Sequence, residues 1–119
     1  MNCPKCKSTM QPHENNYGIK ISKCGACKGM WFPDGSAGVK SALPVAKDID
    51  TGVNAGLDEM KNINCPECSG SMIDMVDSKQ HHIRFESCGK GCGVFLDAGE
   101  LVDLSEYTLI ERVKQVIGG

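Results

Sequence analysis

The stretch CPKCKSTM at residues 3–10 decides the fold, because it returns as CPECSGSM at residues 65–72, an offset of 62. Both cysteines, the proline and the methionine are shared between the two copies. Further along, CGACKGMWF at residues 24–32 aligns with CGKGCGVFL at residues 88–96, and the offset has grown to 64. This repeat indicates two units of the same structure, the second with a connection two residues longer.

The first four cysteines have the spacing of a zinc site. Two Cys-x2-Cys pairs are separated by 17 residues, and their members are Cys3, Cys6, Cys24 and Cys27. In such a pair a tight turn presents both sulfurs to one ion, and a hairpin brings the second pair opposite to complete a tetrahedron. We therefore predict a zinc ion here, with a disulfide pair or unbound thiols as the alternative.

The second set of cysteines departs from this spacing at one place. The pairs are 19 residues apart, and three residues rather than two separate the last two ligands of the set Cys65, Cys68, Cys88 and Cys92. Two glycines in that insert, and Gly93 after it, predict a widened turn that still aims both sulfurs inward. We predict a second zinc ion, making two per chain. The histidines are interpreted as surface residues: His13, His81 and His82.

Composition also favours metal over a conventional core. The chain of 119 residues has three Phe, two Tyr and one Trp, too little apolar bulk to hold a small domain without an additional staple. No stretch approaches 18 apolar residues, and the first cysteine at position 3 leaves no room for an export signal before the folded part. We therefore expect a cytoplasmic protein that does not enter a membrane and keeps its thiols reduced.

Each copy is predicted to run as Cys pair, strand, turn, strand, Cys pair, apolar strand and helix start. Ile19 and Ile21 alternate with polar residues in the first copy, as Ile83 and Phe85 do in the second, which is the period of a half-buried strand. The last strand of each copy is apolar at successive positions. Strand content is therefore expected to come from two short antiparallel units.

Three helices are predicted outside these strands. One begins at Asp34 or Ser36 and ends before Pro44, and another runs over 54–61 from a cap at Asn54. The sequence DAGE at residues 97–100 has the pattern of a capping box and predicts a helix from about 98 to 117. Apolar residues recur along that helix at helical spacing: Leu109, Val113 and Val116.

With CPxC opening each copy, and CGACKGMWFPDG (24–35) and CGKGCGVFLDAGEL (88–101) closing them, the sequence resembles the transcription factor IIB type zinc-finger family. The likeness covers about 1–36 and 63–104, and the first copy departs from the family pattern with Pro33 in place of Asp and Ser36 in place of Glu. The resemblance implies a three-stranded zinc ribbon, zinc binding by the four cysteines of each copy, and a non-catalytic role often connected with nucleic acid or transcription.

The resulting fold class is a small, metal-stabilised α+β protein with two tandem, three-stranded antiparallel zinc ribbons. Its predicted parts are a basic first ribbon, a partly helical connector, an acidic second ribbon and a C-terminal amphipathic helix, over 1–36, 37–62, 63–97 and 98–119. Because the connector contains no cysteine, we expect each ribbon to keep its own zinc when the other is lost.

The charge asymmetry supports one hypothesis about partners. Residues 1–47 carry seven lysines against two acidic residues, whereas residues 48–119 carry six basic residues against thirteen acidic ones. A nucleic-acid-binding first ribbon would use a set of cations with one aromatic ring for stacking: Lys5, Lys7, Lys20, Lys23, Lys28 and Trp31. The competing interpretation is that these lysines offset the charge of the first zinc site and that Trp31 is core.

The favoured hypothesis is a protein-interaction adaptor, and the role expected for it is in transcription or regulation. Eight thiolates and two zinc ions change the formal net charge from −2 to −6, which is unfavourable for a general nucleic-acid binder. The acidic second ribbon and the stripe of Leu109, Val113 and Val116 are then the docking surface, although the stripe serves equally as core. The oligomeric state stays open.

A catalytic role is not expected. Four thiolates close a zinc site and leave no position for a reacting water. Thiol redox chemistry is a minor alternative, but redox Cys-x-x-Cys motifs occur as one pair in a βαβ setting, whereas here four pairs come two by two.

Overall fold

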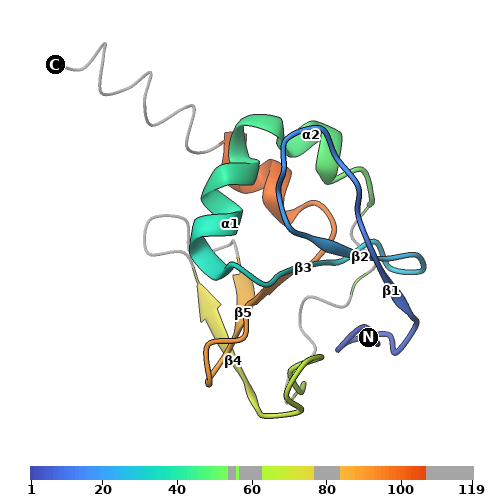
Figure 1. The fold of residues 1–119 in the computed structure, drawn as a ribbon, viewed down its shortest axis with the longest axis vertical. Coiled ribbons are helices and arrows are strands. Elements are labelled where there is room, and N and C mark those ends of the chain that lie inside the picture. Colours follow the sequence, from blue (N-terminus) through green and yellow to red (C-terminus); the bar gives the residue numbers. More distant parts are fainter. Residues whose placement is uncertain (54–55, 57–62, 77–83, 107–119) are drawn as a thin grey trace, which may run out of the picture.

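A six-stranded antiparallel sheet runs through the described part of the chain (Figure 1). The computed structural model describes residues 1–53, 56, 63–76 and 84–106. The strands lie in the order β1-β2-β3-β6-β5-β4. Their bounds are Met10–Pro12 for β1, Ser22–Cys24 for β2, Met30–Phe32 for β3, Met72–Val76 for β4, Arg84–Cys88 for β5 and Val94–Leu96 for β6.

The sheet consists of two three-stranded units joined edge to edge, which confirms the predicted pair of zinc ribbons. Strands β1, β2 and β3 form the first unit, β4, β5 and β6 form the second, and every neighbouring pair is antiparallel. The joint is the pair β3–β6, in which Trp31 lies opposite Phe95. Each copy supplies its own four cysteines, which was one ground for expecting each ribbon to keep its zinc when the other is lost. The shared sheet adds a physical connection between the two ribbons that this expectation did not include.

The sequence offset makes the joint symmetric. Trp31 and Phe95 are 64 residues apart, which is the repeat offset, so these partners occupy equivalent positions in their own units. On either side of them, Met30 pairs with Leu96 and Phe32 with Val94, again exchanging equivalent positions. The two ribbons are therefore related by an approximate two-fold axis that passes through the Trp31–Phe95 pair.

Both central strands are buried at every position, and their side chains alternate between two hydrophobic clusters. The helix-side cluster is Ile21, Met30, Phe32, Val39, Ala42, Ala46, Ile49, Val94, Leu96 and Leu101. The sulfur-side cluster is Cys3, Met10, Cys24, Cys27, Trp31, Cys65, Cys88 and Phe95. One face of the central sheet is thus covered by helices, and the other carries the cysteines of both units.

The helices gather in the upper part of Figure 1, on one side of the sheet. They comprise α1 (Gly35–Ala42), the 3-10 turn η1 (Leu43–Val45), α2 (Ala46–Ile49) and helical residues 100–106. The helix predicted to end before Pro44 is α1, which begins after Asp34 with no side-chain cap. Gly56, the described residue of the predicted helix over 54–61, lies in a bend with φ 77°, which does not fit a helix. The other residues of that helix, and Leu109, Val113 and Val116, lie outside the described residues. Within the described ranges, none of the helices has the length and apolar character needed to cross a bilayer.

Hydrogen bonds join the connector to the first ribbon and to the helical segment that follows the second ribbon. The Asp50 carboxylate accepts the N–H groups of Gly99 at 2.9 Å and Val102 at 3.1 Å, and so caps the helical segment that follows the second ribbon. From the first ribbon, Lys23 Nζ donates to the Ile49 carbonyl at 2.6 Å. The sequence pattern had pointed to residues 97–100 for the cap, and the contribution of Asp50 was missed.

Candidate metal centres

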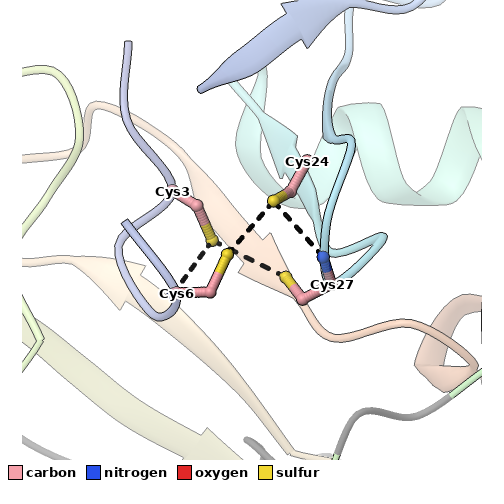
Figure 2. Close-up of side chains that lie close together, drawn as sticks. All are labelled: Cys3, Cys6, Cys24 and Cys27. Carbon is pink, nitrogen blue, oxygen red and sulfur yellow. Dashed lines mark hydrogen bonds between the residues drawn. The ribbon is translucent and has the colours of Figure 1, made fainter. Parts of the chain in front are cut away.

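The first four cysteines converge from two turns (Figure 2). Cys3 and Cys6 lie in the turn before β1, whereas Cys24 ends β2 and Cys27 lies in the turn to β3. All four sulfurs lie within 4.8 Å of one another. The Sγ atoms of Cys3 and Cys27 are 3.7 Å apart, and those of Cys6 and Cys24 are 3.3 Å apart.

The second set repeats this arrangement in the second ribbon. The sulfurs of Cys65, Cys68, Cys88 and Cys92 also lie within 4.8 Å of one another, and the Cys68 and Cys88 Sγ atoms are 3.6 Å apart. A tetrahedral ion with four sulfur ligands at about 2.3 Å requires sulfurs about 3.8 Å apart. Both sets fit zinc on that criterion, and the chain holds two zinc ions.

Backbone N–H groups point at the sulfurs, as thiolate ligands require. The amides of Cys6 and Cys27 each lie 3.5 Å from the first sulfur of their own pair. In the second ribbon, Glu67 N–H lies 3.4 Å from Cys65 Sγ and Lys90 N–H lies 3.3 Å from Cys88 Sγ. These donors disperse the negative charge of four thiolates around one ion.

Three of the four turns close in the same way. The residue after the second cysteine has a positive φ, 69° at Lys7, 65° at Lys28 and 63° at Ser69, and its N–H bonds the carbonyl of the first cysteine. Left-handed conformations are costly for residues with a side chain. Three metal turns therefore contain a strained residue directly after their second zinc ligand, a feature that the residue types at these positions did not reveal.

The fourth turn is not widened, contrary to the prediction from its three-residue spacing. Here the left-handed residue is Gly91, with φ 83°, and its N–H bonds the Cys88 carbonyl at 3.0 Å. The outer bond of the turn is kept, because Cys88 N–H reaches the Gly93 carbonyl at 3.0 Å just as Cys24 N–H reaches Gly29 at 2.9 Å. The turn therefore has the same length as its counterpart in the first ribbon, and only the last ligand stands one position further along the chain.

The thiol pKa values differ within each site. Desolvation opposes ionisation of Cys6, but hydrogen bonds from Ser8 outweigh it and lower the pKa of this thiol to about 6. A hydrogen bond from the Cys92 backbone lowers the pKa of Cys88 to about 6. Burial raises the pKa of Cys27 far above its ordinary value, and shared hydrogen bonds with Cys68 and Cys88 raise the pKa of Cys92 to about 12. Zinc must displace the remaining protons when it binds.

Two of the residues predicted to meet a partner are buried instead. Lys5 is 3% exposed, and its Nζ lies 2.7 Å from both the Glu86 and the Asp97 carboxylates. Trp31 is fully buried and donates its indole N–H to Glu67 at 2.9 Å. The prediction that Lys5 contacts phosphate and that Trp31 stacks on bases is therefore wrong for the folded protein, because both groups are used inside the molecule.

The other predicted cations lie nearer the surface. Lys7, Lys20 and Lys28 are exposed, whereas Lys23 is half-buried and donates to the connector. Lys7 also donates to the Pro4 carbonyl at 3.2 Å. His13 is half-buried outside the sulfur sets, and burial followed by the nearby Lys23 charge lowers its pKa. The candidate cationic surface is thus reduced to three exposed lysines.

Comparison with known families supports the first ribbon directly. The family described as "Transcription factor zinc-finger" matches residues 2–36, the segment that contains the first four cysteines and β1 to β3. No curated protein matches the chain, and no solved structure does. The family match and the two groups of four cysteines show a zinc-binding module, in which the second site rests on its own sulfur geometry.

Proposed function

We propose that the protein is a non-catalytic, zinc-stabilised adaptor that binds a segment of another protein. The observation that carries this proposal is a groove of about 820 Å³ on the helix side of the sheet. Its lining includes Val39 from α1, Leu43 from η1, Phe85 from β5, Leu96 from β6 and Leu104 from helical residues 100–106. Concave, mostly apolar surfaces of this size can bind the row of apolar side chains along one face of a partner's helix.

Charge at the groove indicates the kind of segment. Lys40, Lys47 and Asp48 line the groove from α1 and α2, and all three are exposed. Asp48 accepts the Tyr17 hydroxyl at 2.6 Å, and Glu106 lines the groove from helical residues 100–106. An amphipathic helix with acidic residues beside its apolar stripe complements Lys40 and Lys47. This acidic amphipathic helix is the partner we propose. The groove thereby replaces the acidic second ribbon, which sequence composition suggested, as the proposed docking surface.

The zinc sites support an adaptor better than an enzyme. Each site offers four sulfur ligands, the full complement of a structural zinc ion. Their role in this proposal is to hold β3 and β6, whose other side chains form the floor under the helices. The cysteines belong to the opposite cluster and do not line the groove.

Site-specific photo-crosslinking tests the adaptor proposal. A benzophenone side chain at Leu43 is expected to give one discrete protein adduct in cells, and the same group at exposed Lys20 serves as the matched control. A peptide containing the crosslinked segment should then bind the purified protein. Reversing both charges with Lys40→Glu and Lys47→Glu should weaken that binding at least tenfold, and Lys20→Glu should not. Absence of an adduct at Leu43 contradicts the proposal.

Nucleic-acid binding is the second candidate, and the three exposed lysines Lys7, Lys20 and Lys28 are the observation that favours it. Three phosphate contacts imply a log–log salt slope of about −3. Fluorescence anisotropy of the full, zinc-loaded chain with single- and double-stranded oligonucleotides measures this slope. No binding at about 50 mM salt, where phosphate contacts are strongest, contradicts this candidate.

A further inference from the structure

The two ribbons exchange contacts through equivalent residues at their joint. Lys5 lies between Cys3 and Cys6, and at the offset of 62 its counterpart between Cys65 and Cys68 is Glu67. Lys5 reaches into the second ribbon, where it binds Asp97 and Glu86, and its Nζ lies 5.7 Å from the centre of the Phe95 ring. Glu67 reaches into the first ribbon and accepts the Trp31 indole N–H.

Aromatic packing at the joint is reciprocal in the same way. A Cβ atom added to Gly29 would overlap Cζ of Phe95, and one added to Gly93 would lie 2.7 Å from Cζ2 of Trp31. These two glycines are equivalent at the offset of 64, as are the two aromatic residues. Each ribbon therefore provides a glycine against which the aromatic ring of the other ribbon packs.

These contacts start from the metal turns themselves. Lys5 and Glu67 each stand between two zinc ligands, and Gly29 and Gly93 follow the last ligand of their site by two residues and one residue. When the cysteines of one turn share no ion, the strained turn is not held, and its middle side chain loses its position. For the first ribbon, that leaves the buried Glu86 and Asp97 carboxylates without the Lys5 ammonium group.

We propose that the two zinc sites are thermodynamically coupled, so that zinc at either site raises the affinity of the other through the joint between the ribbons. The sulfur-side cluster contains ligands of both sites around Trp31 and Phe95, so ordering one site completes part of the surface of the other. Repulsion between two sites of charge −2 opposes this effect. The buried contacts outweigh it, and by linkage each site must affect the other by the same factor.

Single-site variants of the full chain measure the coupling. Cys3→Ser with Cys6→Ser leaves only the second site, and Cys65→Ser with Cys68→Ser leaves only the first. Competition with a zinc chelator gives the affinity of each remaining site and the overall two-zinc affinity of the unaltered chain. We expect the overall constant to exceed the product of the two single-site constants at least tenfold. Equality of the two quantities overturns the proposal.

A variant that keeps every zinc ligand provides the second test. Native mass spectrometry during zinc titration reports the fractions of chains with no, one or two ions. At half loading, two equal and independent sites leave about half of the chains with one ion. Tenfold coupling between the sites lowers this one-zinc fraction to about a quarter. Lys5→Met should raise the one-zinc fraction above that of the unaltered chain. Lys7→Met, which removes an exposed ammonium group from the same turn, should not. Identical titrations for Lys5→Met and the unaltered chain overturn the proposal.

Discussion

The two ribbons use one pattern of cysteines and strands, but they fasten to each other by different chemistry. At one end of the joint, the buried Lys5 ammonium group lies between Glu86 and Asp97. At the equivalent end, the Glu67 carboxylate accepts one hydrogen bond from Trp31. The first is a buried ion network and the second a single hydrogen bond at a more exposed site, so equivalent positions contribute unequal free energies.

The difference is traceable to residues that the repeat does not share. In the first ribbon, the positions equivalent to Asp97 and Glu86 are Pro33 and Ser22. Neither of these residues is charged, so they offer Glu67 no ion pair. The acidic residues of the second ribbon are used to hold a lysine of the first. Part of the charge asymmetry along the chain is therefore internal complementarity, and only the remainder is available at the surface for partners.

Removal of both zinc ions should cause the largest loss of stability. Both ribbons then unfold, so the different contacts by which they hold each other no longer matter. Apparent zinc-binding free energies of structural sites reach about 10–16 kcal/mol, more than the folding free energy of a small domain. We expect excess chelator to unfold both ribbons together. The loss of dispersed amide signals in NMR spectra measures this unfolding. Re-addition of two equivalents of zinc should restore them. One ribbon that stays folded without metal would contradict this expectation.

Acidification should release zinc from both ribbons over the same pH range. In the folded arrangement of the thiols without metal, Cys6 and Cys88 have pKa values of about 6, Cys92 has a pKa of about 12, and burial raises the pKa of Cys27 above its ordinary value. Zinc therefore displaces protons even at neutral pH, and affinity falls as pH falls, by about tenfold per pH unit for each proton displaced. Below pH 6 the Cys6 and Cys88 thiolates also take up protons, which steepens the loss.

Zinc release against pH, measured with a chromophoric chelator, checks this prediction. Because each ribbon contains one thiol of lowered pKa and one of raised pKa, the two steps should overlap. Affinity that is unchanged between pH 8 and pH 6 would show that the thiols are already ionised without metal.

Lys5→Met should have the next largest effect, because it breaks the stronger half of the joint. Removing one partner of a buried ion network leaves uncompensated charge and costs about 3–5 kcal/mol. Denaturant unfolding of the zinc-loaded chain measures the loss, and Lys7→Met is the control because that lysine is exposed. A loss of the same size in both variants would place the effect in the metal turn instead of the ion network.

The sequence was sufficient for the features fixed by local spacing. The four Cys pairs, the two strand triplets and the end of α1 before Pro44 follow from cysteine spacing, alternation and proline chemistry, which act over a few residues. Burial of Trp31 was one of the two interpretations that the sequence left open, and the structure decides for it. Burial of Lys5 against Glu86 and Asp97 was not predicted, since it depends on contacts between segments far apart in the chain. The cap contributed by Asp50 was missed for the same reason: its partners are 49 and 52 residues away.

One signal for the joint was nevertheless present in the sequence. The strands MWF (30–32) and VFL (94–96) have no polar residue in alternation, unlike the flanking strands. Such strands are typical of the centre of a sheet covered on both faces, not of the edge of an isolated three-stranded unit. Together with the repeated glycine before each apolar strand, this pattern predicts that the third strands of the two units pair with each other.

Glu67→Ala should have the smallest effect and sharpens the comparison most. It removes the acceptor of the Trp31 N–H, and a hydrogen bond of this kind contributes about 0.5–1.5 kcal/mol, with an added penalty when the remaining donor is buried. Glu67→Gln keeps an acceptor oxygen at the same place and should lose less. Both values should fall well below that for Lys5→Met, although the two residues are equivalent in the repeat. Equal losses at the two positions, measured by denaturant unfolding, would mean that the buried ion network around Lys5 contributes no more to the joint than the single hydrogen bond between Trp31 and Glu67.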